Sequence, residues 1–354
     1  MAYTTVDNPE LFFQVKLYTG TGSSHAVTLD GNSDMQPDWV WIKCRDDSHN
    51  NQLFDSVRGV HKRLRSDTTG VQTESSESLK SFDSDGFTVG TQANVNASAS
   101  GDNSFVAWCW RGGTAFSNDA SSTGVGSIDS SGTSSTTAGI SICKWTGTGS
   151  NGTVKHGLTS IPEVLLQKNT GYAYSWYTWH TGIPINQYLK LDTTGTATSS
   201  DSGGVTFGNT DPTASVFSLG NDGGSNRSGD AHICYIFHSV QGFSKFGLFR
   251  GNANADGAYI HLGFRPAWIM IKSSTAGEHW NIHDNKRDPF NVCDKGLKAN
   301  TSGVDDDNDR LDFLANGFKH RSTSGGYNSD NRFVYYAFAE SPFVNSNGVP
   351  NNAR

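Results

Sequence analysis

Short apolar runs, separated by clusters of Gly, Ser, Thr, Asn and Asp, recur along the whole chain. In WVWIK (39–43) and WIMIK (268–272) every residue before the final lysine is apolar. Runs of this length bounded by turn-forming residues indicate β-strands, and the lack of polar alternation indicates strands covered on both faces. The pattern therefore predicts an all-β protein made of packed sheets, as in the inner strands of a β-sandwich.

Three sequence markers each occur three times, in the same order. In the second marker the lysine follows the proline by six residues in every copy. The markers are YTGTG (18–22), WTGTG (145–149) and the degraded FRGNA (249–253); PDWVWIK (37–43), PEVLLQK (162–168) and PAWIMIK (266–272); and SFVAWCW (104–110), HICYIFH (232–238) and RFVYYAF (332–338). Internal repetition of this kind indicates one duplicated module. We therefore predict tandem β-sandwich modules in three related repeats of about 100 residues.

The markers also predict where one repeat ends and the next begins. A segment rich in Ser, Thr and Gly separates the first two repeats, and we interpret it as a linker or an extended surface arm. Because only SVQGFSK (239–245) joins the second repeat to the third, these two are expected to pack as a pair, with the first more independent. The predicted division is an N-terminal arm over 1–16, repeat 1 over 17–110, a linker over 111–138, repeat 2 over 139–238, repeat 3 over 239–345 and a C-terminal tail over 346–354.

Composition and charge restrict the classes of partner. The net charge is −7 and Lys and Arg form no cluster, so nucleic acid is not an expected partner. No apolar stretch approaches the roughly 18 residues of a membrane span, and the N-terminus does not resemble a signal peptide. The five cysteines are scattered without a C-x-x-C pair, which favours buried thiols over a disulfide framework or a zinc site. We expect a protein made in a cytoplasm, without membrane insertion and without a cofactor.

A carboxylate and a guanidinium recur at the same offsets in two repeats. Asp55 and Arg58 follow the marker lysine by 12 and 15 residues (55−43 and 58−43), and Asp284 and Arg287 do the same (284−272 and 287−272). Such a pair could bind a sugar hydroxyl or a charge on a partner. The alternative is an internal ion pair that orders a loop, because Arg and carboxylate make good bidentate partners. Repeat 2 has His180 at the first of these positions, which weakens a catalytic interpretation.

The segment YAYSWYTWH (172–180) is the densest aromatic patch in the chain. Exposed Trp and Tyr side chains can stack on sugar rings or anchor a protein interface. Trp176 and Trp280 both follow the marker lysine by eight residues (176−168 and 280−272), a shared offset that is also typical of core positions. The candidate ligand-binding aromatic residues are Tyr174, Trp176, Tyr177, Trp179 and Trp280.

Acidic segments raise the question of calcium. GVDDDNDRLD (303–312) could hold Ca²⁺ with oxygen ligands, but a solvated acidic turn is the favoured interpretation, and a site at Asp305–Asp309 stays open. NANADG (252–257) mimics the start of an EF-hand loop without its full ligand set. The sequence contains no G-x-S-x-G, HExxH or P-loop motif, and no paired carboxylates at a defined spacing. We therefore expect no enzyme, although glycosidase carboxylates leave no sequence signature.

The combined motifs resemble structural proteins of marine tailed phages, including cyanophages. The resemblance is carried by YTGTGSSHAVTLDGNSDMQPDWVWIK (18–43), GFSKFGLFRGNANADGAYIHLGFRPAWIMIK (242–272) and YYAFAESPFV (335–344), and it covers nearly the whole chain. It implies concanavalin-like or jelly-roll sandwich modules in a virion component, often described as tail-fibre-like. It implies no catalytic residues.

These observations lead to one main expectation and two alternatives. The main expectation is a virion structural protein assembled in the host cytoplasm, associated with the tail, that binds a host surface carbohydrate or receptor. Its other partners would be virion proteins, including copies of itself, with a trimer favoured. The first alternative is a capsid or tail decoration protein that stabilises the particle. The second is a polysaccharide-degrading enzyme.

Overall fold

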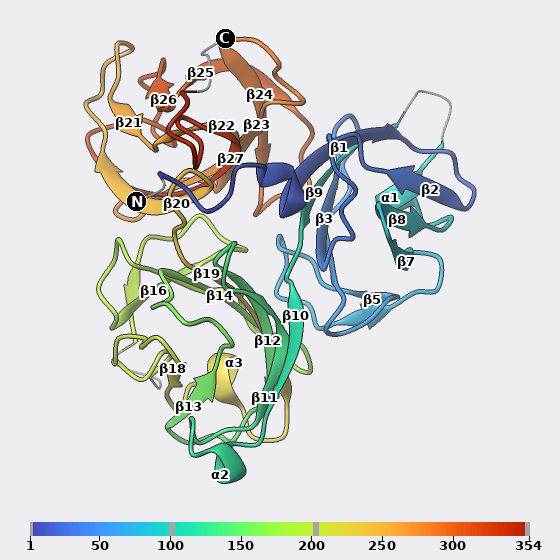
Figure 1. The fold of residues 1–354 in the computed structure, drawn as a ribbon, viewed down its shortest axis with the longest axis vertical. Helices are drawn as coiled ribbons and strands as arrows, with labels where there is room; N and C mark the ends of the chain where they lie inside the picture. The colour runs from blue at the N-terminus through green and yellow to red at the C-terminus, as the bar shows by residue number, and fades with distance from the viewer. Residues whose placement is uncertain (1–2, 99–102, 201–204, 351–354) are drawn as a thin grey trace.

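The computed structural model describes residues 3–98, 103–200 and 205–350, and of Asp309 only the backbone. Almost all of the regular structure is antiparallel β-sheet, and the chain forms three lobes around a common centre (Figure 1). The all-β sandwich prediction is therefore confirmed. None of the helices in the described part of the chain is long and apolar enough to cross a membrane.

Repeat 1 is a sandwich of two sheets, with strand orders β1-β9-β3-β4 and β2-β8-β7. Its own core lies between them and contains Val40, Phe54, Phe87 and Phe105. The elements are η1 (Pro9–Leu11), β1 (Phe13–Thr19), β2 (His25–Thr28), β3 (Trp39–Cys44), β4 (Gln52–Asp55), β5 (Lys62–Arg63), β6 (Thr73–Glu74), β7 (Leu79–Asp83), β8 (Gly86–Val89), α1 (Ala93–Asn96) and β9 (Ser104–Trp110).

Repeat 2 uses the same arrangement, with β12-β19-β14-β15 inside a longer sheet and β13-β18 opposite. The elements are β12 (Ile140–Thr146), β13 (Gly152–Lys155), β14 (Val164–Asn169), β15 (Tyr177–His180), β16 (Gln187–Lys190), β17 (Thr198–Ser199), β18 (Val216–Leu219), α3 (Gly223–Asn226) and β19 (Ala231–Phe237).

Repeat 3 has the order β20-β27-β22-β23 within one eight-stranded sheet, which continues through β24, β25 and β26 to β21. Apolar side chains of β22 and β26 share a core, so the far strands of the sheet cover the near ones. The elements are β20 (Ser244–Arg250), β21 (Tyr259–His261), β22 (Phe264–Ser273), β23 (Asn281–Asp284), β24 (Cys293–Lys298), β25 (Asp306–Leu314), β26 (Gly317–His320) and β27 (Arg332–Pro342).

The sequence markers occupy matching places in the three sheets. The second marker forms β3, β14 and β22, and the third forms β9, β19 and β27. In each repeat these two strands pair so that the marker lysine lies opposite an aliphatic residue of the third marker. The three pairs are Lys43 with Val106, Lys168 with Ile233 and Lys272 with Val334. This register aligns any residue of one repeat with its counterparts in the other two.

The Gly-Thr-Gly phrase of the first marker turns the chain against a buried asparagine. In repeat 1 the backbone NH of Thr21 donates to Asn96 Oδ1 at 2.7 Å. In repeat 2 the NH of Thr148 donates to Asn226 Oδ1 at 2.9 Å. A Cβ on Gly147 would lie 2.2 Å from a backbone carbonyl oxygen, so only glycine can adopt this approach. Close backbone packing thus explains why the phrase recurs along the chain.

The three repeats share one aromatic core at the centre of the molecule. The ring of Trp39 in repeat 1 stacks on Tyr235 of repeat 2 with 4.3 Å between centroids. Trp110 of repeat 1 meets Trp268 of repeat 3 edge-on at 5.6 Å. Each four-stranded unit therefore buries one face within its own sandwich and the other against its neighbours. The expectation that repeat 1 is more independent is wrong, because its tryptophans need the other two repeats to exclude water.

Hydrogen bonds between repeats follow a cyclic pattern that approximates a threefold axis. The residue eight positions after each marker lysine donates a side-chain N–H to a backbone carbonyl of another repeat. The bonds are Asn51 Nδ2 to Lys298 O at 3.2 Å, Trp176 Nε1 to Arg65 O at 2.7 Å and Trp280 Nε1 to Lys190 O at 2.9 Å. Repeat 1 thus contacts repeat 3, repeat 2 contacts repeat 1 and repeat 3 contacts repeat 2. A single chain builds what resembles a closed trimer of its repeats.

The segment 111–138 is not a linker. It forms β10 (Thr114–Asn118), α2 (Ala120–Thr123) and β11 (Ser130–Ser135), and β11 pairs with β12 over six residue pairs from 130↔145 to 135↔140. The hairpin therefore extends the sheet of repeat 2. Ser and Thr tolerate such a strand because β12 satisfies its backbone hydrogen bonds, and the buried Ser130 hydroxyl donates to Lys155 O at 2.8 Å. Composition alone suggested a flexible segment because it contains few apolar residues.

Candidate functional site

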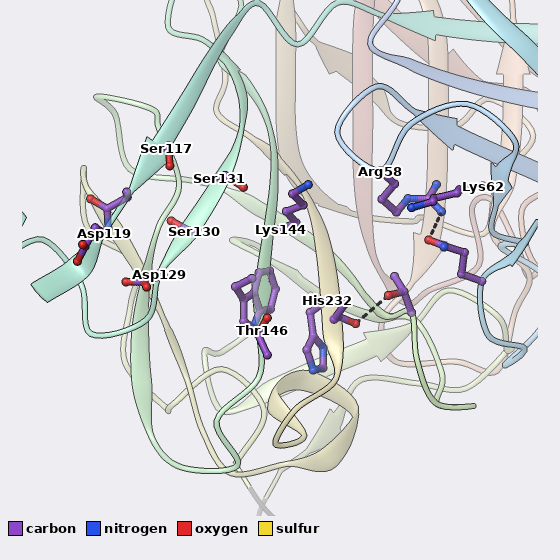
Figure 2. A pocket seen from close by; sticks show the side chains of 15 residues that line it. Arg58, Lys62, Ser117, Asp119, Asp129, Ser130, Ser131, Lys144, Thr146 and His232 are labelled. Carbon is purple, nitrogen blue, oxygen red and sulfur yellow. Dashed lines mark hydrogen bonds between the residues drawn. The ribbon is translucent and has the colours of Figure 1, made fainter.

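A groove of about 460 Å³ opens between repeats 1 and 2 (Figure 2). Three parts of the chain supply its walls: the loop after β4, the β10–β11 hairpin, and the ends of β12 and β19. The backbone NH of Gln72 donates to the carbonyl of Thr170 at 3.0 Å, which joins the loop of repeat 1 to repeat 2 beside the groove. A volume of this size is within the range of small-ligand sites in proteins.

The groove exists because the hairpin breaks the threefold pattern. β1 and β20, the counterparts of β12, are the end strands of their sheets, whereas β12 is followed by β11 and β10. Among the described residues, repeat 2 alone therefore has a wall that projects beyond its first strand. A feature that distinguishes one of three otherwise similar interfaces is a stronger candidate for function than a feature shared by all three.

Three cations line the groove, Arg58 and Lys62 on the side of repeat 1 and Lys144 on β12 of repeat 2. The Arg58 guanidinium is fixed by Asp55, whose Oδ2 accepts from its Nε at 2.5 Å, and by Gln72, whose Oε1 accepts from its Nη1 at 3.3 Å. Lys144 donates to a backbone carbonyl of repeat 1 at 3.0 Å and remains exposed to solvent. Lys62 is 4.0 Å from the carboxylate of Glu74, too far for a strong ion pair. Lys62 and Lys144 therefore keep donors free for a ligand.

The opposite side is polar and acidic. Figure 2 shows Ser117, Asp119 and Asp129 on the hairpin, across from Arg58 and Lys62, whereas Lys144 lies beside Ser131, its partner in the β11–β12 ladder. Hydrogen bonds from the hydroxyl of Ser121 and the NH of Ser122 lower the pKa of Asp119, so it is charged at neutral pH. Asp129 accepts the NH of Ala120 at 2.8 Å, which holds the hairpin loop against β11. Hydroxyl and carboxylate groups on this side can accept from and donate to a ligand rich in hydroxyls.

The chemistry of the groove suits binding. His232 lines it, but its ring stacks on Trp145 inside repeat 2 at 5.4 Å, and burial lowers its pKa to about 4. It is therefore neutral at physiological pH and turned towards the core of its own repeat. What the groove offers a ligand is Arg58 and Lys62 on the side of repeat 1, hydroxyl and carboxylate groups on the hairpin, and Lys144 between them.

The predicted Asp-Arg pairs hold the repeats together. Asp55 accepts from Arg58 and also from the hydroxyl of Tyr235 in repeat 2 at 2.7 Å. Asp284 accepts from Arg287 at 2.6 Å and from the indole of Trp108 in repeat 1 at 3.0 Å. Both carboxylates are fully buried, so neither can reach a ligand. Only Arg58 borders the groove.

The histidine aligned with these aspartates supplies the third contact in the cycle of interfaces between the repeats. The ring of His180 lies 4.9 Å from that of Tyr336 in repeat 3, and its Nε2 is 3.1 Å from the carbonyl of Tyr335. All three repeats thus use this position to contact the next one. The recurrence that suggested a binding pair reflects the repeated interface.

The predicted aromatic platform does not form. Trp176 and Trp280 are fully buried and donate to neighbouring repeats, while Tyr177 and Trp179 are 7% and 5% exposed in the core. A buried ring cannot stack on a sugar, so these four are structural. Tyr174 is half-buried, with its ring 5.3 Å from that of the exposed Tyr172.

The acidic segment of repeat 3 is not a solvated turn, because β25 begins at Asp306 and the aspartates at its start pair with cations. Asp305 pairs with Arg45 at 2.9 Å and with Arg287 at 2.8 Å. Asp306 pairs with Lys298, and Asp307 with a neighbouring lysine. The side chain of Asp309 lies outside the described residues. Across the described ranges, no group of three or more His, Cys, Asp or Glu side chains is arranged to hold a metal ion.

Sequence reasoning missed a set of buried structural lysines. Lys43, Lys168 and Lys272 are fully buried, and burial lowers the pKa of each to about 8. Lys168 Nζ donates to Thr69 O in repeat 1, and Lys272 Nζ to Thr194 O in repeat 2, both at 3.1 Å.

A fourth repeated motif could have revealed this role. LRSDTTG (64–70), LKLDTTG (189–195) and LKANTSG (297–303) occur once in each repeat. Each supplies the carbonyl that accepts from the residue eight positions after a marker lysine of another repeat. The sequence therefore contained the acceptors of the interface as well as its donors.

A family model describes nearly the whole body seen in Figure 1. The domain of unknown function DUF7483 matches residues 8–342. The chain belongs to the DUF7483 family. The DUF7483 match spans all three repeats without interruption, in agreement with a structure in which the repeats share one core. Comparison with curated proteins and with solved structures gave no match.

Proposed function

We propose that this DUF7483 protein is a surface component of a tailed-phage particle that binds an acidic host-envelope glycan in the groove between repeats 1 and 2. The resemblance of its repeat markers to phage structural proteins supports the virion role. The observation that carries the binding role is the groove itself, which brings Lys62 and Lys144 together with serine and aspartate side chains at the interface that the hairpin modifies.

The charge distribution favours a glycan with acidic groups. Lys62 and Lys144 have donors free for carboxylate or sulfate oxygens, while the serines and aspartates across the groove can bind sugar hydroxyls. An uncharged groove would offer no cation to the acidic groups of a glycan and no carboxylate to its hydroxyls.

The binding test uses paired variants. K62Q and K144Q remove the cations without adding bulk, and K80Q removes an exposed lysine of repeat 1 outside the groove as a matched control. We expect the double variant to lose at least tenfold in affinity for extracted host polysaccharide, K80Q to bind as the unmodified protein does, and the polysaccharide to be recovered intact. Equal binding by all three proteins, or equal binding of carboxyl-reduced polysaccharide, would contradict the proposal.

The virion role has its own test. Quantitative mass spectrometry and electron cryomicroscopy of purified particles should find the protein at the tail in a few copies. Its absence from particles would refute the virion role whatever the glycan result.

A decoration role is the second candidate. The approximate threefold axis of a single chain favours it, because such a body can sit on a local threefold position of a particle without itself forming a trimer. Many copies over the head, together with loss of particle stability when the gene product is missing, would support this role.

A further inference from the structure

The interior of repeat 3 is polar at three positions that are apolar in repeat 1. His283 lies opposite Ile269 of β22, which is three residues before the marker lysine. At the same position of the strand register, repeat 1 has Phe54 and repeat 2 has Trp179, and both side chains are buried. The third repeat thus replaces a large apolar side chain of its core with an imidazole.

Two further positions change in the same direction. His320 ends β26, where Val89 ends β8 in the first repeat. Tyr327 precedes the asparagine that holds the Gly loop, and Val95 precedes it in repeat 1. Burying polar groups destabilises a fold unless they find hydrogen-bond partners. Three such residues in one sandwich therefore need partners that offset the cost of burying them.

Two of these side chains, His283 and Tyr327, form the base of a polar network. His283 Nε2 and the hydroxyl of Tyr327 are 2.9 Å apart, and the two residues are 0% and 3% exposed. The Arg310 guanidinium lies over the Tyr327 ring at 5.0 Å. Several atoms nonetheless lack a hydrogen-bond partner among the described residues: Arg310 Nε, Asp306 Oδ1, His283 Nδ1 and both ring nitrogens of His320. Buried groups left unpaired in this number point to a ligand or ordered water.

A pocket of about 190 Å³ adjoins this network. Tyr327, Arg310, Asp306, Lys298, His279 and Glu278 line it. The volume is far above the ~10–15 Å³ that one water molecule needs. Lys298 and Asp306 neutralise each other at 3.0 Å. Within the described ranges Arg310 and Glu278 form no ion pair, so one free cation and one free anion face the same space.

We propose that this pocket binds a neutral monosaccharide unit. The lining charges cancel, since Arg310 and Lys298 balance Glu278 and Asp306. A charged ligand would leave one of the two free groups uncompensated, whereas sugar hydroxyls can donate to Glu278 and Asp306 Oδ1 and accept from Arg310 in one pose. His283 is a positioning residue that holds the Tyr327 hydroxyl beneath the pocket. This site lies in another repeat from the groove and does not depend on it.

The test measures hexose binding by saturation-transfer difference NMR on the full chain, with glucose, galactose and mannose as probes. We expect at least one hexose to bind, at least tenfold loss of affinity in both R310M and E278Q, and full retention in R250M. Arg250 is an exposed arginine of the same repeat, so R250M controls for loss of a positive charge. Circular dichroism confirms the fold of each variant, and E278Q tests the proposal if R310M does not fold.

Three outcomes would overturn the proposal: no binding of any hexose, binding that survives both pocket variants, or tighter binding of glucuronate or glucosamine than of the hexoses. A negative result for this pocket can be distinguished from a negative result for the groove between repeats 1 and 2. K62Q with K144Q should leave hexose binding unchanged, and E278Q should leave binding of the acidic polysaccharide unchanged.

Discussion

The contact between Tyr235 and Asp55 offers a direct measure of what holds the repeats together. Replacing Tyr235 with Phe removes one hydroxyl that donates to the Asp55 carboxylate at 2.7 Å across the interface of repeats 1 and 2. Both residues are fully buried, so water cannot replace the lost bond. Asp55 keeps the Nε and the backbone NH of Arg58 as donors at 2.5 and 2.8 Å, which limits the damage.

The expected cost is about 2 kcal/mol in the free energy of unfolding, the middle of the range for a hydrogen bond to a charged group. The chain supplies its own control. Tyr336 occupies the aligned position in repeat 3, opposite Met270, as Tyr235 lies opposite Leu166. Its hydroxyl is buried with no hydrogen-bond partner in the described part of the chain. Y336F should therefore be neutral or slightly stabilising, because it removes a buried group that is unpaired.

Urea titrations of the three proteins, followed by tryptophan fluorescence, compare the unfolding free energies under one set of conditions. The slope of the transition should be the same in all three, since neither change alters the surface exposed on unfolding. Equal destabilisation by Y235F and Y336F would refute the argument, because it would assign the effect to ring packing. No effect from Y235F would show that the interface does not depend on this bond.

Three further perturbations test other parts of the structure. W176F removes the indole donor to Arg65 O at 2.7 Å; it should cost about 1–3 kcal/mol in urea unfolding while leaving polysaccharide binding intact, and loss of binding in a folded variant would contradict the structural role. G147A should fold poorly in a solubility and circular dichroism assay, because its Cβ would lie 2.2 Å from a carbonyl oxygen; native-like stability would contradict the close approach. Burial lowers the pKa of His180 to about 4 and of His320 to about 3. The unfolded chain therefore binds more protons below pH 6.5, and stability is lost as pH falls from 6.5 towards 4, by up to about 3 kcal/mol per histidine. H320F should reduce this loss in urea titrations at pH 7 and pH 5, and an unchanged pH dependence would count against it.

Much of the fold could be predicted from local pattern. WVWIK and WIMIK are strands covered on both faces, as their apolar runs indicated, because a strand between two packed layers has no polar side. The recurring Gly-Thr-Gly phrase and the marker proline also identified equivalent places in three sandwiches. The shared offset of Trp176 and Trp280 suggested core positions, and both are buried.

The candidate site could not be predicted in the same way. The groove joins Lys62, Ser117, Lys144 and His232, which no spacing in the chain connects. The hairpin that forms its wall consists mostly of Ser, Thr and Gly. Its strands therefore lack an apolar pattern, and the sequence predicted a linker there. The pocket of repeat 3 became visible only when strand register aligned His283 with Phe54 and Trp179.

By itself, the sequence determined the number of repeats, the strands that each contains and the residues that each must bury. It did so because alternation, turn residues and close-packed glycines act over a few positions of the chain. Only the tertiary structure decided which faces meet, since an apolar face can be covered by a partner sheet, a neighbouring repeat or another chain with similar gain in free energy. In this protein the second face of each sheet is buried against the other repeats. That choice made Asp55, Asp284 and Trp176 structural, and both proposed binding sites lie where the repeats differ from one another.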